Sequence, residues 1–209
     1  SITSIITMLF IFGMVGILKY ATYLLFYGGI ALLLVLGIKY KEKLFTAVKS
    51  VPFIIYTISA IVYLYLMKDA QLFFWDEYSH WGAFIKEMYY FHKFYDTSSV
   101  ATHLNYPPGI SIWDYFIVLS TGFTEGKLYF GYFLILFSST LMMYEKLIWK
   151  QIHWIVLIFL IQMLVFATYG HWFSCIYVDH IVGAIFAGIV LSYMSDKFSS
   201  KEFFLLVFP

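Results

Sequence analysis

Two adjacent acids, Asp76 and Glu77, directly follow the apolar run "LFFW" in the stretch "FFWDEYSHWGAFIKEM". Ionisable side chains beside membrane-type sequence are unfavourable, and they are usually functional. A carboxylate in such surroundings is suited to act as a general base that takes a proton from a hydroxyl group. The alternative is that Asp76 only caps the following helix, because acids are favoured in the first turn of a helix.

A second group of polar residues surrounds a Pro-Pro pair in "HLNYPPGISIW". Pro107 and Pro108 fix two φ angles and remove two backbone donors, which prevents the next helix from starting earlier. The resulting rigid turn would present His103, Asn105 and Tyr106 at the membrane interface as candidate substrate-binding residues. A turn that merely starts a helix explains the same pattern equally well.

A third group lies in "YGHWFSCIYVDHIVGAIFAG". Asp179 and His180 open an apolar helix that meets no further charge until Asp196. An acid in this position is a candidate member of the same site, although capping of the helix is again the alternative. His171 and Trp172 precede it, and a tryptophan ring is a common surface for stacking on sugars.

These groups are carried by a chain that is 62% hydrophobic and only 12% charged, whereas roughly a quarter of the residues of soluble domains are charged. Uncharged runs of about 17 to 20 residues are typical of membrane-spanning helices. The expected fold is an all-α polytopic membrane protein with about seven or eight transmembrane helices. We expect a single membrane domain over residues 1–209, as a piece of a longer chain. The expected helices cover residues 2–18, 21–38, 51–67, 128–144, 152–169 and 176–194, with a shorter apolar stretch at 110–121 and another segment from Phe203.

Residues 76–93 form a two-sided helix when they are placed on a wheel of 100° per residue. Asp76, His80 and Glu87 share its polar face, and the opposite flank is apolar. Glu77 falls at the edge of the apolar flank. We therefore expect an amphipathic helix that lies in the membrane interface.

The placement of lysine predicts the orientation of the chain. The connection 39–50 carries four lysines and should be cytoplasmic, so the loop of residues 70–109 should be external. If the stretch 110–121 is short, tilted or re-entrant, every lysine-bearing loop returns to the cytoplasm and Asp179 faces the same side as Asp76. If it spans fully, Asp179 falls on the opposite side. About 12 residues are too few to cross about 30 Å of hydrocarbon as an untilted helix, which favours the first alternative.

Composition also excludes some classes of function. A formal net charge of +1 argues against electrostatic capture of nucleic acid. The single cysteine, Cys175, excludes an internal disulfide and a cysteine metal cluster.

Taken in order, the three motifs resemble the polytopic glycosyltransferases of the GT-C superfamily, above all the branch of protein mannosyltransferases and aminoarabinose transferases. Members of that branch carry an Asp-Glu pair at the start of an interfacial helix in the first external loop. A Pro-Pro turn then leads into the following membrane helix, and two helices later an Asp opens another. The corresponding segments here are "WDEYSHWGAFIKEM", "NYPPGISIW" and "YVDHIVGAIFAG". The likeness covers residues 51–194, which would form the catalytic core.

The resemblance implies a role for each acid. Asp76 would be the base that activates an acceptor hydroxyl, Glu77 its supporting acid and Asp179 the second external acid. Metal use varies across the superfamily, so His80 and His103 are candidate ligands of a divalent metal ion. The candidate substrate-binding residues are His80, Lys86, His103, Asn105, Tyr106, His171, Trp172 and His180.

The implied function is transfer of a sugar from a polyprenyl-phosphate-linked donor to a hydroxyl group of a glycan, lipid or protein acceptor. The expected location is a bacterial cell membrane, with the active site on its external face and membrane lipids around the helices. Because phosphate is a good leaving group, the protein mainly needs positioning, one base and positive charge for the departing phosphate. Lys68, Lys86 and Lys93 are the nearest candidates for that charge.

Two other functions stay open. A transporter or flippase could use Asp76, Glu77 and Asp179 as a proton or substrate relay, but such proteins contain inverted repeats and broken helices, and the sequence shows no repeat. A non-catalytic membrane subunit could use the amphipathic helix as a docking surface, and it would tolerate Asp76→Asn.

Overall fold

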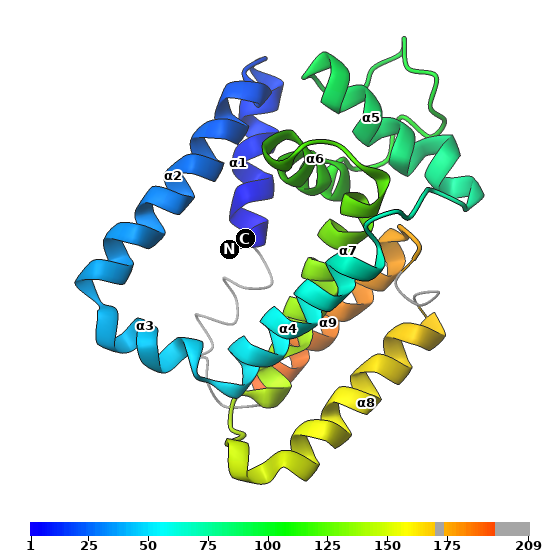
Figure 1. Cartoon of the computed structure of the whole chain (residues 1–209). Helices are drawn as coiled ribbons and strands as arrows, with labels where there is room; N and C mark the ends of the chain where they lie inside the picture. Colours follow the sequence, from blue (N-terminus) through cyan, green and yellow to red (C-terminus); the bar gives the residue numbers. More distant parts are fainter. Residues whose placement is uncertain (170–173, 195–209) are drawn as a thin grey trace.

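The computed structural model describes residues 1–169 and 174–194, and all regular structure in these residues is helical. The expected all-α class is therefore confirmed. The segment expected from Phe203 lies outside the described residues. In chain order the helices are α1 (Ile2–Met14), α2 (Leu18–Lys39), α3 (Lys41–Val48), α4 (Val51–Leu66), η1 (Glu77–Trp81), α5 (Gly82–Phe91), α6 (Gly109–Thr121), α7 (Glu125–Thr140), η2 (Leu141–Tyr144), η3 (Trp149–Gln151), α8 (Ile152–Tyr169) and α9 (Val178–Met194) (Figure 1).

Local chemistry accounts for several helix boundaries. Gly16 adopts a positive φ of 77°, which glycine alone accepts freely, and this ends α1 four residues before the expected boundary at residue 18. Ser50 caps α4, since its side chain accepts a hydrogen bond from the N–H of Phe53. At α7 the helix begins with Glu125, three residues before the first residue of the apolar run, because an acid is favoured in a first turn.

The described residues contain fewer candidate membrane spans than the sequence predicts. Within the described residues, three helices are long and apolar enough to cross a membrane, at Leu18–Lys39, Glu125–Tyr144 and Trp149–Ala167. A fourth span results if α3 and α4, which meet at an angle of 65°, are counted as one. Helices α1, α6 and α9 are apolar but too short for this length criterion. The integral membrane character is consistent with these spans, whereas a count of seven or eight is not supported.

The chain leaves and re-enters the bundle at the same end between α4 and α7. The first turn of α7 lies against the end of α4, because the space beside Gly126 is occupied by the carbonyl of Met67. The side chain of Glu125 also accepts a hydrogen bond of 2.7 Å from the N–H of Leu72. Helix α6 therefore does not carry the chain from one end of the bundle to the other. This agrees with the alternative in which the stretch 110–121 is short, tilted or re-entrant.

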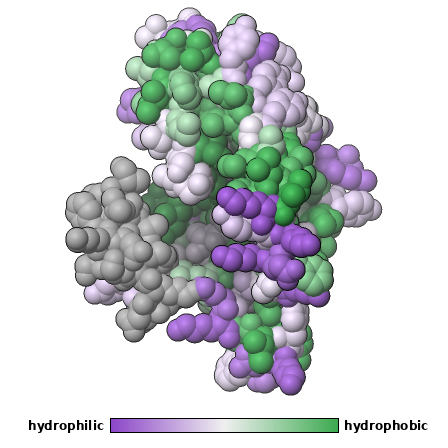
Figure 2. All heavy atoms as spheres, turned by 90° about the vertical axis from the view of Figure 1, so that its left-hand side faces the viewer, coloured by the Kyte–Doolittle hydropathy of each residue, from purple (hydrophilic) through white to green (hydrophobic). Residues whose placement is uncertain are grey.

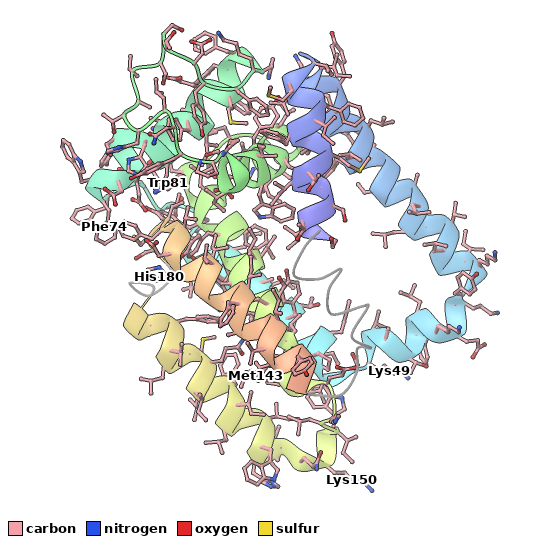
Figure 3. All side chains as sticks on the ribbon, turned by 180° about the vertical axis from the view of Figure 1, so that it is seen from behind. Lys49, Phe74, Trp81, Met143, Lys150 and His180 are labelled. Atoms are coloured by element: carbon pink, nitrogen blue, oxygen red, sulfur yellow. The ribbon has the colours of Figure 1, made fainter. Side chains whose placement is uncertain are left out.

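The two ends of the bundle differ in charge. We call residues 67–109 and 174–180 the acid end, and residues 39–50 and 145–151 the lysine end. At the lysine end the indole N–H of Trp149 donates to the carbonyl of Lys49 at 3.0 Å. Figure 3 shows Lys49 and Lys150 far from Phe74, Trp81 and His180. Hydrophilic side chains gather across the middle and lower part of the face in Figure 2, which looks onto the side of α2 and α3.

Helix α7 forms the centre of the core. It packs against α4, α6 and α9, and the ring of Phe133 stacks on that of Tyr63 at a centroid distance of 4.3 Å. Helix α8 is attached by polar contacts near its middle, where Gln162 hydrogen-bonds Tyr144 and Thr140 at 2.5 Å each. Most other side chains of α8 are exposed, as expected of a helix that faces lipid.

The amphipathic helix has a different partner from the one expected. The apolar residues Phe84, Ile85 and Met88 of α5 are fully buried and contribute to its packing on α6. Their hydrophobic burial is therefore satisfied by protein rather than by the membrane interface.

Candidate functional site

The first turn of the predicted interfacial helix is a π-helix, η1, and not an α-helix. A π-turn holds more residues than the 3.6 of an α-helix, so a wheel of 100° per residue misplaces its side chains. His80, expected on the polar face with Asp76 and Glu87, is buried with 4% of its surface exposed. Glu77 lies inside the protein and not at the edge of the apolar flank.

The carboxylate of Glu77 is fully buried and is bound by four donors. Its Oε2 accepts hydrogen bonds from the N–H groups of Phe73 (2.8 Å) and Phe74 (3.0 Å) and from the hydroxyl of Tyr129 (2.9 Å). Its Oε1 accepts a bond of 2.9 Å from the N–H of Ile176. A buried carboxylate is stable in a protein only when it is hydrogen-bonded or paired in this way. Glu77 thus ties the loop before η1 to α7 and to the segment before α9.

The neighbouring Asp76 is partly exposed. Its side chain caps no helical N–H, so the capping alternative does not describe what this carboxylate does. Instead it is hydrogen-bonded to the side chain of Tyr177. Burial, the nearby Cys175 and the acids at 76 and 77 raise the pKa of Tyr177, which keeps its phenol protonated as a donor to Asp76.

The segment before α9 brings the third predicted motif to the same place. Ile176 is buried and donates to Glu77, while the hydroxyl of Tyr132 donates to the carbonyl of Tyr177 at 3.0 Å. The same hydroxyl lies 2.9 Å from Nδ1 of His180. Asp179 is exposed in the first turn of α9. The acids at 76 and 179 therefore lie at one end of the bundle, where Figure 3 shows Phe74 and His180.

A cluster of rings adjoins η1. The ring of His80 lies 5.2 Å from that of His103 and 5.3 Å from that of Tyr106, between ring centroids. Trp81 stacks on Tyr106 at 5.5 Å. Desolvation lowers the pKa of His80, the acid at 76 acts to raise it, and His103 adds to the lowering. His80 is thus held in its neutral form at neutral pH.

The other predicted binding residues are placed as follows. Asn105 is exposed beside the Pro-Pro turn. Lys86 forms an ion pair of 2.6 Å with Glu125. The two further lysines that were candidates for a donor phosphate, at 68 and 93, pair with Asp69 (3.7 Å) and Asp96 (2.6 Å). His171 and Trp172 lie outside the described residues.

Metal binding receives no support from geometry. Over residues 1–169 and 174–194, no three His, Cys, Asp or Glu side chains gather in a way that would hold a metal ion. His80 and His103 are neighbours, but a pair of histidines is fewer ligands than metal sites in proteins use.

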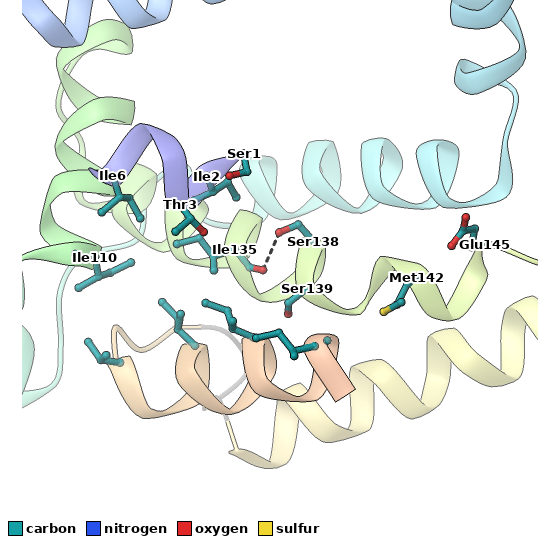
Figure 4. Close-up of a pocket in the computed structure, with 16 residues that line it drawn as sticks. Ser1, Ile2, Thr3, Ile6, Ile110, Ile135, Ser138, Ser139, Met142 and Glu145 are labelled. Atoms are coloured by element: carbon teal, nitrogen blue, oxygen red, sulfur yellow. Dashed lines mark hydrogen bonds between the residues drawn. The ribbon is translucent and has the colours of Figure 1, made fainter. Parts of the chain in front are cut away.

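An apolar groove of about 910 Å³ runs between α1, α7 and α9 (Figure 4). At the acid end it meets Gly109, which follows the Pro-Pro turn, and Val178, which precedes Asp179; at the lysine end it reaches Glu145. The hydroxyls of Ser138 and Ser139 bond to carbonyls of their own helix. Because these hydroxyls are satisfied, the groove offers mainly apolar surface.

Two residues of this region were not identified from the sequence. Tyr177, the partner of Asp76, carries no signal in the sequence, because tyrosine is abundant in the chain. Asp114 is fully buried within α6. Its signal was present, since it is the one charged residue in the apolar stretch 110–121.

Comparison with protein-family models, with curated protein sequences and with solved structures finds no match to this chain.

Proposed function

We propose that this protein is a membrane glycosyltransferase that transfers a sugar from a polyprenyl-phosphate-linked donor to an acceptor hydroxyl group. The observation that carries the proposal is the junction at the acid end, where Glu77 binds the backbone of Ile176 and Asp76 binds Tyr177. This junction joins the Asp-Glu motif to the Asp of the third motif across about a hundred residues of chain.

The reaction would be a single displacement. The acceptor oxygen attacks the anomeric carbon of the sugar, the bond from that carbon to the phosphate oxygen breaks, and polyprenyl phosphate leaves with the bonding electrons. The proton of the acceptor hydroxyl passes to the carboxylate of Asp76. Asp76 fits this role because it is partly exposed and is oriented by one donor, the phenol of Tyr177.

Glu77 would act as a positioning residue. All four of its interactions are with protein donors, and it is fully buried. It would hold Asp76 and the start of α9 in a fixed relation, which is the pre-organisation that catalysis by positioning requires.

The groove and the ring cluster supply binding surfaces for the donor. The apolar groove starts beside the Pro-Pro turn and Val178 and is suited to the lipid chain. The exposed ring of His103, which stacks on that of Tyr106 at 5.0 Å, offers a flat surface for a sugar. The pairs Lys68–Asp69 and Lys93–Asp96 are exposed, and exposed ion pairs are weak, so these lysines can exchange a carboxylate for a phosphate at little cost.

The test is transfer of a labelled sugar from a polyprenyl-phosphate donor by the purified protein in detergent. Asp76→Asn should reduce the transfer rate by at least about 100-fold, as expected for loss of a general base. Glu87→Gln is the control, because Glu87 is an acid of the same loop that accepts an exposed hydrogen bond from the N–H of Val100 and has no part in the proposed reaction, and it should transfer at the wild-type rate.

Three results would overturn the proposal. The first is equal transfer by wild type and Asp76→Asn. The second is wild-type protein that moves the intact lipid-linked sugar across a vesicle bilayer without transferring it, as a flippase would. The third is wild-type protein that does neither while Asp76→Asn supports normal growth in cells, as expected of a non-catalytic subunit.

A further inference from the structure

Asp114 is a buried acid that the proposed reaction does not use. It lies in the middle of α6 with none of its surface exposed, and neither carboxyl oxygen has a hydrogen-bond partner among the described residues. Ser111, one turn earlier, is also fully buried and its hydroxyl is likewise unpartnered. Two unsatisfied polar groups on neighbouring turns of one helix are rare in a folded protein and need an explanation.

The carboxyl group occupies a space provided by α7. A side chain at Gly131 would collide with Oδ1 of Asp114, so the absence of a Cβ at that position makes room for the acid. Beside it, the indole N–H of Trp113 donates to the carbonyl of Gly131 at 2.8 Å. Trp113 and Asp114 thus both contact Gly131 of α7, and the acid is enclosed by protein.

Among the described residues, no positively charged group pairs with the acid. The nearest lysines, on the elements packed against α6, have other partners: Lys127 donates to the carbonyls of Thr121 and Gly122, and Lys86 pairs with Glu125. The same holds for the other titratable side chains. His92 contacts Tyr115, Tyr129 donates to Glu77, and Tyr132 contacts Tyr177 and His180. Lys19 and Tyr23 of α2 form no hydrogen bond with Asp114, and α1 contains no charged residue. An ionised carboxylate in this place would carry the full penalty of a buried, unpaired charge.

We propose that Asp114 is a proton-binding site: it is carried as a neutral carboxylic acid, and the bound proton is what lets α6 pack on α7. A neutral acid has an O–H that can donate to a backbone carbonyl of the preceding turn, as serine and threonine do in helices. An ionised carboxylate has only acceptors and no donor faces it.

The proposal fixes the sign of a pH effect on stability. Above about pH 4 an aspartate in the unfolded chain releases its proton, whereas Asp114 in the folded protein keeps it. The folded state then binds more protons than the unfolded state, so the free energy of unfolding falls as the pH rises from about 4 until Asp114 itself ionises. Asp114→Asn, which is neutral at every pH and of similar shape, removes this contribution.

The test is infrared spectroscopy of the purified protein in detergent at neutral pH. Wild type and Asp179→Asn should show the carbonyl band of a protonated carboxylic acid, and Asp114→Asn should lose it. Asp179→Asn is the matched control, because it removes an exposed acid by the same substitution. Retention of the band in Asp114→Asn, or its absence in wild type, would overturn the proposal.

A second measurement needs no variant. Wild-type protein made with aspartate labelled at the carboxyl carbon should show, by carbon-13 NMR, at least one of its six aspartates still protonated at neutral pH. A spectrum with six ionised aspartates contradicts the assignment. So does wild-type protein that is stabilised by added Na⁺ when Asp114→Asn is not, because the acid would then be an ionised cation ligand.

Discussion

At the residue scale, the two adjacent acids at 76 and 77 have different surroundings. Glu77 is enclosed and fully hydrogen-bonded, whereas Asp76 is partly exposed and binds Tyr177. The difference arises from the π-turn of η1, which directs Glu77 toward Tyr129 and Ile176. Chemical identity alone does not separate these residues, but burial does.

The bonds of Glu77 predict a large effect of Glu77→Gln on stability. In Gln, an NH₂ group replaces one carboxylate oxygen, so it would face at least one donor that now bonds to Glu77. The remaining hydrogen bonds would no longer be strengthened by the negative charge of the carboxylate. We expect a loss of at least about 2 kcal/mol in the free energy of unfolding, measured by denaturation in detergent.

The control is Glu87→Gln, the same change at an acid whose hydrogen bond from the N–H of Val100 is exposed to solvent. It should alter the free energy of unfolding by less than about 0.5 kcal/mol. Equal effects of the two substitutions would show that Glu77 does not hold the acid end together.

His80 predicts a pH effect of opposite sign to that of Asp114. Its pKa is lowered in the folded state, so below about pH 6.5 a histidine in the unfolded chain takes up a proton while His80 stays neutral. The unfolded state then binds more protons, and the free energy of unfolding falls as the pH drops from about 6.5 to the pKa of folded His80. His80→Gln should weaken the dependence of the free energy of unfolding on pH over this window, as measured by denaturation at a series of pH values. His153→Gln, at an exposed histidine, should leave that dependence unchanged.

At the scale of elements, α9 packs closely on α7. The space beside Gly188 is filled by the carbonyl of Ser139, whereas the space beside Gly183 on the same helix is open. Small residues at such crossings let helix backbones approach in membrane proteins. Helix α9 is therefore positioned by backbone contact near the lysine end and by Tyr132 and Glu77 at the acid end.

Two substitutions on α9 test this packing. Gly188→Ala should lower the free energy of unfolding by about 1–3 kcal/mol, because the added methyl group overpacks the crossing. Gly183→Ala should be neutral or slightly stabilising, since alanine favours a helix over glycine. Thermal unfolding in detergent distinguishes them, and an equal response at both positions would contradict the close approach of α9 to α7.

Most elements could be predicted from apolar runs, because a run of uncharged residues of helical length has few other structures available. Helices α4 and α8 start where the sequence predicted, and α6 lies within a residue of its predicted start. The π-turn of η1 could not be predicted, since it depends on tertiary bonds to Glu77. Because the wheel assumed 100° per residue through this π-turn, it wrongly placed the buried His80 on the polar face.

At the scale of the whole molecule, the acids and the lysines lie at opposite ends. If the lysine end is cytoplasmic, a cysteine introduced at Thr97 should react with a membrane-impermeant maleimide in intact cells. Lys150→Cys should react only after permeabilisation. Wild type is the control for background, because its single cysteine, Cys175, is buried. Labelling of both introduced cysteines from the same side would contradict the arrangement.

The meeting of the first and third motifs could only partly be predicted. Lysine placement and the shortness of the stretch 110–121 indicated that Asp76 and Asp179 share a side. The bond from Ile176 to Glu77 that joins them leaves no trace in one sequence, because a backbone N–H is the same at every residue. The expected count of seven or eight spans is not supported within the described residues, because the apolar runs at α1, α6 and α9 give helices shorter than a bilayer requires.

The central claim is that acids from two distant segments form one catalytic site, and a double-mutant cycle on the rate of sugar transfer tests it most directly. The variants are Asp76→Asn, Asp179→Asn and the double variant, each measured with saturating polyprenyl-phosphate-linked donor. Groups that act as a unit are strongly non-additive, so the double variant should be about as slow as Asp76→Asn alone. Fully additive losses, or wild-type transfer by either single variant, would contradict the claim.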